Sequence, residues 1–574
     1  MNLLLLGVLL SLVCPFWKHD FVQVGLWLSS MVLVVTAFRR HRQTSPLLSD
    51  FGPPDLFVAS VLLLIFIPLY TGLVYYLPYP VNSDEISIMF SERYFPGLMP
   101  INLLGLSTYF GFPSFIFIVL GWLGRALGGV TLEHMRLISA FFGLAIVLGS
   151  YLLFRVFWGW KESWAASTVL GFNHALVVIS RMAVRDNTAL LADLAALAAL
   201  FSGLERGSSL LTLAGGMLCG LTFYTYYPSR VTLFLWLIVL AGRYLFERPR
   251  PEARALGKLA GAGLLGFWLC AGPVLVATVQ AGDEAARFMR AASLLHSEGR
   301  DLQRQWLGSK TIQQAFRQNV VNGLSAFNTK RPDYSWIYPN LIGRHGFVDP
   351  LTGVLLWIGI LGIWLRRGER EDGSWGRAMS LCFLFLWLLL SFVVNKAPNY
   401  TRLLVTLPFV AYLSVAGIKT LIRLLPLSAS SSLSDFALFV LVVSVSLWNV
   451  GILKAVFENG LKHGQDIGGT GRYIETHKSM PYTFYLAADG VYPYYSWNFP
   501  DGWKTWMSFF AVPGQDVEVI VPGQLAQMPS AGPFTVFMNR QAWARYKEGF
   551  LKAHPKSAIH DITPGGDLLA AEVD

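Results

Sequence analysis

The stretch DLFVASVLLLIFIPLYTGLVYYLPYPVNSDE, from Asp55 to Glu85, decides the fold class of this chain. Its first part, Asp55 to Leu77, is an apolar run long enough for a helix to cross the ~30 Å of hydrocarbon in a bilayer. Two carboxylates, Asp84 and Glu85, follow at the edge of that run. Because carboxylates are costly to desolvate, those at this depth commonly have a function. At an extracytoplasmic edge the pair is suited to acid–base or metal chemistry on a lipid-linked substrate.

Apolar runs of similar length recur along most of the chain. Hydrophobic residues make up 54% of the 574 residues and charged residues only 14%, a composition typical of all-α polytopic membrane proteins. We expect about thirteen transmembrane helices, at roughly twenty residues each. They are predicted at residues 2–17, 21–38, 55–77, 134–154, 163–180, 186–204, 209–226, 230–246, 255–279, 348–366, 377–395, 401–421 and 433–454. The apolar segment 112–127 is shorter and suits a re-entrant or interfacial helix.

Charge and cysteine usage exclude several classes of protein. The net charge is +10, but Lys and Arg cluster between the apolar runs, where they set orientation, so a nucleic-acid partner is not expected. No phosphate-binding loop or dinucleotide-binding glycine motif occurs in the sequence. The cysteines all lie in apolar runs without the spacing of a disulfide framework or zinc site. They are Cys14, Cys219, Cys270 and Cys382.

The basic clusters predict which loops face the cytoplasm. They lie at Arg39–Arg42, at Arg155 and Lys161, at Glu247–Lys258, at Arg366–Arg370 and at Lys419–Arg423. If all are cytoplasmic, the segment 112–127 does not cross the membrane. The polar segments of interest then share the opposite, extracytoplasmic face. They are Asp84 with Glu85, Ser180–Asp186, Tyr224–Arg230, the loop from about 280 to 347, Asn395–Arg402 and the C-terminal tail.

Three domains are expected from these patterns. Residues 1–54 hold two N-terminal helices and a cytoplasmic loop, and residues 55–454 form the main transmembrane domain. Residues 455–574 mix short β-prone runs with turns, and VEVIVPG (517–523) and FTVFMN (534–539) are predicted strands. This last part is predicted to be a small extracytoplasmic α/β domain.

Acidic and basic side chains at the membrane edge are the candidate site residues. Asp84 and Glu85 either solvate a helix end or provide a base for an acceptor hydroxyl. Arg181, Arg185 and Asp186 either cap a helix hairpin or form a phosphate site, with Asp186 holding a cation or an arginine.

Further basic residues stand at the same predicted face. Arg230 follows an aromatic run, and Lys396 and Arg402 lie within NKAPNYTR (395–402); each is either a membrane anchor or an anion ligand. Their convergence on one surface favours an anionic ligand. Asp193, deeper in the helix that follows Asp186, is a buried carboxylate whose partner the sequence does not identify.

These motifs resemble those of the polytopic GT-C glycosyltransferases. The similarity is to the family 39-type group, which includes protein O-mannosyltransferase-like enzymes, the lipid A aminoarabinose transferase and Rgt-type sugar transferases. It covers residues 55–422 and rests on the order of five segments. They are the acidic pair, RLISAFFGLAIVLGSYLLFRVFWG followed by SRMAVRD, GLTFYTYYPSR, GFVDPLTGVLLWIGILGIW and NYTRLLVTLPFVAYLSVAG.

The resemblance implies a GT-C transmembrane catalytic domain. Its activity would be transfer of a sugar from a polyprenyl-phosphate donor to a protein, lipid or glycan acceptor outside the cell (inner or plasma) membrane. By that similarity Asp84 would be the base, and Glu85 and Asp186 would orient substrate or a divalent metal cation. Phosphate binding would fall to Arg181, Arg185, Arg230, Lys396 and Arg402.

Two other functions fit the same residues. A flippase or transporter of lipid-linked sugar would also carry charges in a helical bundle, although such proteins usually have charges at the bilayer midplane and inverted repeats. A lipid-linked glycan ligase or polymerase would use a similar carrier. The sequence does not identify the sugar, the acceptor or the stereochemical outcome.

Overall fold

The computed structural model describes the chain in ranges separated by gaps. The described residues are 2–17, 20–39, 51–74, 85, 88–89, 103–106, 112–247, 249–308, 311–327, 345–365, 373–395, 397–424, 431–462, 466–477, 481–487, 507–508, 510–512, 514–520, 525, 528, 533–562 and 568–573. The chain divides into two units. The first comprises Met1–Val74 and Ser91–Leu453, and the second comprises Tyr75–Phe90 and Lys454–Asp574.

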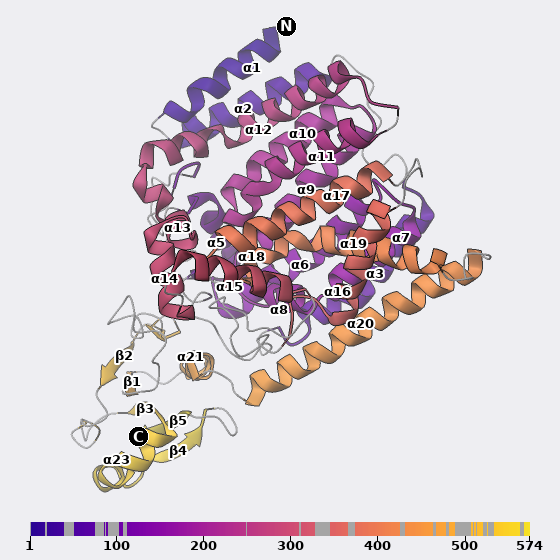
Figure 1. Ribbon diagram of the computed structural model, residues 1–574. Coiled ribbons are helices and arrows are strands. Elements are labelled where there is room, and N and C mark those ends of the chain that lie inside the picture. Colours follow the sequence, from indigo (N-terminus) through magenta and orange to yellow (C-terminus); the bar gives the residue numbers. More distant parts are fainter. Residues whose placement is uncertain are drawn as a thin grey trace. The chain divides into compact units, whose positions relative to one another are not determined.

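The first unit is a bundle of helices (Figure 1). Each predicted span contains a helix. These helices are α1 (Asn2–Val13), α2 (Asp20–Arg39), α3 (Pro53–Thr71), α6 (Leu132–Phe154), α7 (Trp160–Gly171) with α8 (His174–Ser180), α9 (Asp186–Glu205), α10 (Ser209–Leu221), α11 (Thr232–Phe246), α12 (Ala253–Ala281), α16 (Pro350–Leu365), α17 (Gly373–Leu388), α19 (Leu407–Leu424) and α20 (Ser431–Lys462).

Within the described ranges, nine helices are long and apolar enough to cross a membrane, and ten if the bent pair α7–α8 is one span. The chain is therefore a multi-pass membrane protein. Helices α1, α10 and α16 are shorter apolar helices, so their crossing stays a prediction. The segment 112–127 forms α5 (Ser114–Ala126), also shorter than a span.

One predicted helix, 163–180, is broken in the structure. Helices α7 and α8 are bent by 64° at the break between them. The Asn173 side chain accepts a hydrogen bond from the Leu176 amide at 3.0 Å and so caps the start of α8. An asparagine that bonds to the backbone in this way competes with continuation of the preceding helix.

Small residues allow two helix pairs to pack closely. A Cβ atom at Gly216 of α10 would lie 2.0 Å from the carbonyl oxygen of Gly263 in α12. A Cβ atom at Gly359 of α16 would lie 1.9 Å from the carbonyl oxygen of Leu413 in α19. In lipid, where helix association depends on packing, such close backbone contacts are a principal source of stability.

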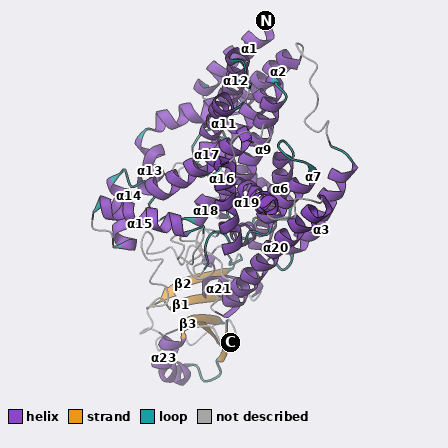
Figure 2. Cartoon of the chain, turned by 45° about the vertical axis from the view of Figure 1, so that its right-hand side comes forward, coloured by secondary structure: helices purple, strands orange, loops and turns teal. Residues whose placement is uncertain are grey.

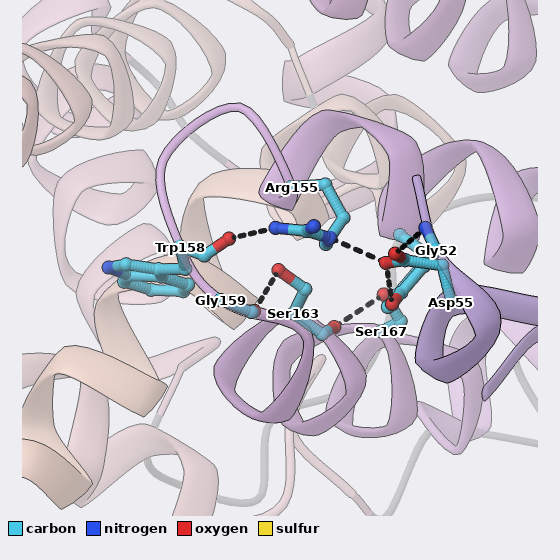
Figure 3. Close-up of polar contacts among 8 residues, drawn as sticks. Gly52, Asp55, Arg155, Trp158, Gly159, Ser163 and Ser167 are labelled. Atoms are coloured by element: carbon cyan, nitrogen blue, oxygen red, sulfur yellow. Dashed lines mark hydrogen bonds and ion pairs between the residues drawn. The ribbon is translucent and has the colours of Figure 1, made fainter. Parts of the chain in front are cut away.

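A buried ion pair joins the start of α3 to the end of α6 (Figure 3). Asp55 Oδ1 accepts hydrogen bonds from Arg155 Nε and from the Tyr151 hydroxyl, both at 2.6 Å. Asp55 Oδ2 accepts one from the Gly52 amide at 2.9 Å, and Arg155 donates to the Trp158 carbonyl at 2.7 Å. Arg155 belongs to a basic cluster predicted to be cytoplasmic.

Asp55→Asn should destabilise the protein strongly. The variant removes the negative charge that Arg155 contacts in a partly buried pair, so the loss should approach the value of about 3–5 kcal/mol that breaking a fully buried pair costs. Asp435→Asn is the matched control, because the Lys161–Asp435 pair is 45% exposed on both sides and should contribute at most about 1 kcal/mol. Unfolding by SDS, followed by far-UV circular dichroism, measures both variants. Equal losses in the two would contradict this role of Asp55.

The second unit contains a five-stranded sheet in the order β2-β1-β3-β5-β4, seen as orange arrows in Figure 2. Its elements are α21 (Asp466–Thr476), β1 (Tyr482–Ala487), β2 (Gln515–Ile520), β3 (Phe534–Asn539), α23 (Arg540–Ala553), β4 (Ala558–Asp561) and β5 (Leu568–Val573). Strands β1, β2 and β3 are parallel, and β5 is antiparallel to β3 and β4. The two predicted strands correspond to β2 and β3. The predicted α/β fold of the C-terminal part is confirmed.

The acidic stretch after α3 belongs to this second unit. Its described residues Glu85, Ile88 and Met89 are all buried. The expected boundaries 1–54, 55–454 and 455–574 remain a prediction, and they did not anticipate that residues 75–90 would group with the C-terminal part.

Candidate functional site

The structure describes most of the predicted site residues. Asp84 and Lys396 lie outside the described residues, and Glu85 belongs to the second unit. A distance of about 10 Å or less between the acidic pair and Asp186, as a shared site requires, therefore stays a prediction. The other predicted residues lie in the first unit. They are Arg181, Arg185, Asp186, Arg230 and Arg402.

Four of these five residues gather around two consecutive tyrosines. We call this group the arginine site, and it consists of Arg185, Asp186, Tyr226, Tyr227, Arg230 and Arg402. Arg185 and Asp186 stand at the start of α9, and Arg230 lies in the short helix η4 (Tyr227–Val231) before α11. Arg402 lies in α18 (Tyr400–Leu403), just before α19. The site is thus assembled from helix ends that are distant in sequence.

Arg185 is held against aromatic rings. Its guanidinium carbon lies 3.7 Å from the centroid of the Phe112 ring and 5.5 Å from those of Phe117 and Tyr226. A planar guanidinium stacks on such faces with a favourable cation–π interaction. The residue is only 8% exposed. A permanent positive charge is therefore kept in a largely dry environment.

Arg230 lies beside the second tyrosine. Its guanidinium carbon is 4.1 Å from the centroid of the Tyr227 ring. The Tyr227 ring is 4.8 Å from that of Phe112, on which Arg185 stacks. Two arginines from different helices thus approach one aromatic cluster.

Tyr226 connects the remaining charges. The charges of Asp186, Arg402 and Arg185 act on its hydroxyl. Tyr226 and Asp186 are buried, at 7% and 4% exposure. The site therefore combines three guanidinium groups and one carboxylate with two tyrosines, and this excess of positive charge suits an anionic ligand.

The turn that carries Tyr226, Tyr227 and Arg230 is cross-linked by side-chain hydroxyls. Ser229 donates to the Tyr226 carbonyl at 2.6 Å, and the Ser229 and Thr225 hydroxyls lie 2.8 Å apart. Pro228, with its fixed φ angle, stands in the first turn of η4. These features fix the short 3-10 helix and the turn before it between α10 and α11, and so direct the two tyrosines.

The segment that carries Arg402 is held by its own cap and by helices of the long loop. The Asn399 side chain accepts from the Arg402 amide at 3.3 Å. Asn319 of α15 (Ile312–Ser325) donates to the Val394 carbonyl at 2.6 Å, and Asn322 donates to the Ala397 carbonyl at 3.2 Å. The backbone on both sides of Lys396 is therefore anchored to α15.

Arg181 has a different role in the structure. It is 2% exposed and donates hydrogen bonds to the Leu69, Tyr70 and Gly72 carbonyls at the end of α3. The last carbonyls of a helix need such partners. This geometry favours the capping alternative for Arg181 over phosphate binding.

The predicted metal ligands Glu85 and Asp186 lie in different units of the structure, so a shared cation site stays a prediction. Within the described part of the chain, no group of three or more His, Cys, Asp or Glu side chains is close enough to hold one. Asp186 brings one carboxylate into surroundings dominated by arginines. Hard cations require several oxygen ligands, so no catalytic step is assigned to a metal here.

Sequence reasoning missed the aromatic partners of the site. Phe112 was included only in a short apolar segment and was not considered as a partner of Arg185. A second unpredicted feature is a buried network in which His174 bonds to Asn449 and Asn449 donates to Asp349 at 2.8 Å. Partners so distant in sequence leave no local pattern by which to find them.

Comparison with solved structures identifies the architecture. The chain is similar to ArnT from Cupriavidus metallidurans bound to undecaprenyl phosphate, with a TM-score of 0.50, 14% identity, and coverage of 90% of this chain and 97% of that one. It is also similar to the apo oligosaccharyltransferase of Archaeoglobus fulgidus, with a TM-score of 0.50, 12% identity, and coverage of 86% and 71%. The chain has the GT-C fold.

The GT-C fold was the one implied by the sequence motifs, and that expectation is confirmed. No family model matches the sequence, and no curated protein matches it. At identities of 12–14% the likeness establishes the GT-C fold alone.

Proposed function

We propose that this protein is a membrane glycosyltransferase. It transfers a sugar from a polyprenyl-phosphate-linked donor to a protein, lipid or glycan acceptor at the extracytoplasmic face of the cell membrane. The observation that carries the proposal is the arginine site, where Arg185, Arg230 and Arg402 surround two tyrosines at helix ends. The ArnT structure with the same fold holds undecaprenyl phosphate, the lipid that such a transfer releases.

The chemistry explains why a GT-C protein would need this group of side chains. Displacement at the anomeric carbon leaves a polyprenyl phosphate whose negative charge grows as the bond breaks. Guanidinium groups held in a largely water-free site stabilise that charge without reorganisation. Arginine is suited to the task because its planar donors match phosphate oxygens.

The roles of general base and substrate orientation are assigned to acidic residues. In this proposal Asp84 removes the proton from the acceptor hydroxyl as it attacks, and Glu85 and Asp186 orient the substrate. Lys396, close to Arg402 in the sequence, adds positive charge for the phosphate in this proposal. A lipid phosphate already carries the activated sugar, so no nucleotide-binding domain is required.

A turnover assay tests the proposal. The purified protein in vesicles, given a polyprenyl-phosphate sugar and an acceptor, should release polyprenyl phosphate and glycosylate the acceptor. Because arginines supply the positive charge, EDTA should leave the rate unchanged. Loss of sugar transfer with EDTA, and its recovery with Mg²⁺ or Mn²⁺, would instead favour a cation bound by Glu85 and Asp186. Movement of the lipid-linked sugar across vesicles without transfer would assign the chain to the flippase class.

The proposal also predicts the topology. Single cysteines at Asp84, Asp186, Arg230, Lys396 and Pro500 should react with reagents outside the cell, and those at Arg40, Arg250 and Arg367 should not. The structure supports this division, because the Asp55–Arg155 and Lys161–Asp435 pairs bring together residues from the ends predicted to be cytoplasmic. A buried position such as Asp186 is interpreted only if its cysteine reacts in permeabilised cells, because burial alone would also prevent labelling. Labelling at Asp84 only in permeabilised cells would contradict the orientation.

A further inference from the structure

Asp193 is a carboxyl group in the interior of the bundle that the proposed chemistry does not use. It lies about two turns after Asp186 in α9 and is 2% exposed. Its Oδ2 atom is buried and has no hydrogen-bond partner among the described residues. Its described polar neighbours are the Thr232 hydroxyl and the Cys219 thiol, neither of which carries a positive charge. An ionised carboxylate in such surroundings would be very costly.

The number of hydrogens available for hydrogen bonds indicates whether the Asp193 carboxyl group is ionised or protonated. The Thr232 hydroxyl oxygen lies within hydrogen-bond distance of Asp193 Oδ1 and also 2.7 Å from the Ser229 carbonyl oxygen. A hydroxyl has a single hydrogen to donate. If Asp193 were ionised, one of these two acceptors would receive no hydrogen. If Asp193 is protonated, it donates to Thr232, and Thr232 donates to the Ser229 carbonyl.

The protonated form creates a continuous connection between two parts of the arginine site. Ser229 donates in turn to the Tyr226 carbonyl at 2.6 Å. The connection therefore runs from α9, which begins with Asp186, to the turn that carries Tyr226. It fixes the spacing between side chains that would have to bind one phosphate together.

We propose that Asp193 is a positioning residue of the arginine site and that it works as a neutral carboxylic acid. The positioning part rests on the proposed function, because it assumes that the site binds a lipid phosphate. The neutral state rests only on the burial of Asp193 and the hydrogen-bond geometry around it, without any assumption about function. Two measurements separate these parts.

The first measurement uses the full-length protein without ligand. Infrared difference spectra at neutral pH should show the carbonyl band of a protonated carboxyl group in the wild type. Asp193→Asn should remove this band, whereas the control Asp435→Asn, at a half-exposed ion pair, should leave it. Absence of the band, or its persistence in Asp193→Asn, would overturn the neutral state.

The second measurement is binding of undecaprenyl phosphate in vesicles. Asp193→Asn keeps the shape and a donor for Thr232, so it should bind with wild-type affinity. Asp193→Leu and Thr232→Val each break the connection and should weaken binding about tenfold. Circular dichroism confirms that each variant is folded, and rescue by Asn separates positioning from simple loss of packing.

Two results of the binding measurement would overturn the positioning role. One is equal weakening by Asp193→Asn and Asp193→Leu, and the other is wild-type affinity in Asp193→Leu. Failure of the wild type to bind undecaprenyl phosphate would remove both the positioning role and the proposed function. The infrared band would still be observed in that case, because it is measured without ligand. Failure of the neutral state can therefore be distinguished from failure of the proposed function.

Discussion

Asp84→Asn should reduce sugar transfer by about two to four orders of magnitude, the usual range for loss of a general base. The substitution keeps the size of the side chain and removes its ability to accept a proton. Binding of the lipid donor should survive, because the proposal assigns the phosphate to arginines. The measurement is the rate of polyprenyl phosphate release alongside the affinity for undecaprenyl phosphate.

The matched control is Asp283→Asn. Asp283 lies on the same predicted face, at the start of α13 (Asp283–Ala292), and its side chain is 97% exposed. This variant should transfer sugar at the wild-type rate. Wild-type transfer by Asp84→Asn would remove Asp84 from the mechanism and leave Glu85 or Asp186 as the base.

Arg185→Met should have the largest effect on donor binding. Arg185 is the most deeply buried of the three arginines around Tyr226 and Tyr227. Loss of a buried charge-assisted contact typically costs about 2–5 kcal/mol, or roughly thirtyfold or more in Kd. Methionine retains the apolar contact with Phe112, so the change reports mainly on charge.

Three further variants serve as comparisons for Arg185→Met. Arg185→Lys should recover binding only in part, because an ammonium lacks the planar donors and stacks poorly. Arg230→Ala should also weaken binding. Arg254→Met removes an exposed arginine from a predicted cytoplasmic loop and should have no effect. A similar loss in Arg254→Met and Arg185→Met would point to general surface attraction instead of a site.

The sequence predicted the helices well because their signal is local. Runs of apolar residues about as long as the bilayer is thick leave little alternative to helices. The bend between α7 and α8 was missed because it depends on Asn173, a single capping residue within an otherwise apolar run. The sheet was predicted through β2 and β3, whose sequences are rich in β-branched and aromatic residues.

The candidate site was predicted through its charges and not through its partners. Arg185, Arg230 and Arg402 stood out because charged residues beside apolar runs are rare. Their convergence on Tyr226 and Tyr227 depends on tertiary structure. Arg181 and Arg185 looked equivalent in the sequence. In the structure the guanidinium of Arg181, four positions earlier in the chain, binds the carbonyls at the end of α3 instead of the tyrosines.

The most direct test of the account is a cryo-electron-microscopy map of the protein in lipid with undecaprenyl phosphate bound. The account predicts density for the phosphate beside Tyr226 and Tyr227, within hydrogen-bond distance of at least two of the guanidinium groups of Arg185, Arg230 and Arg402. Density for the phosphate at another place, with these three arginines contacting only protein, would contradict it.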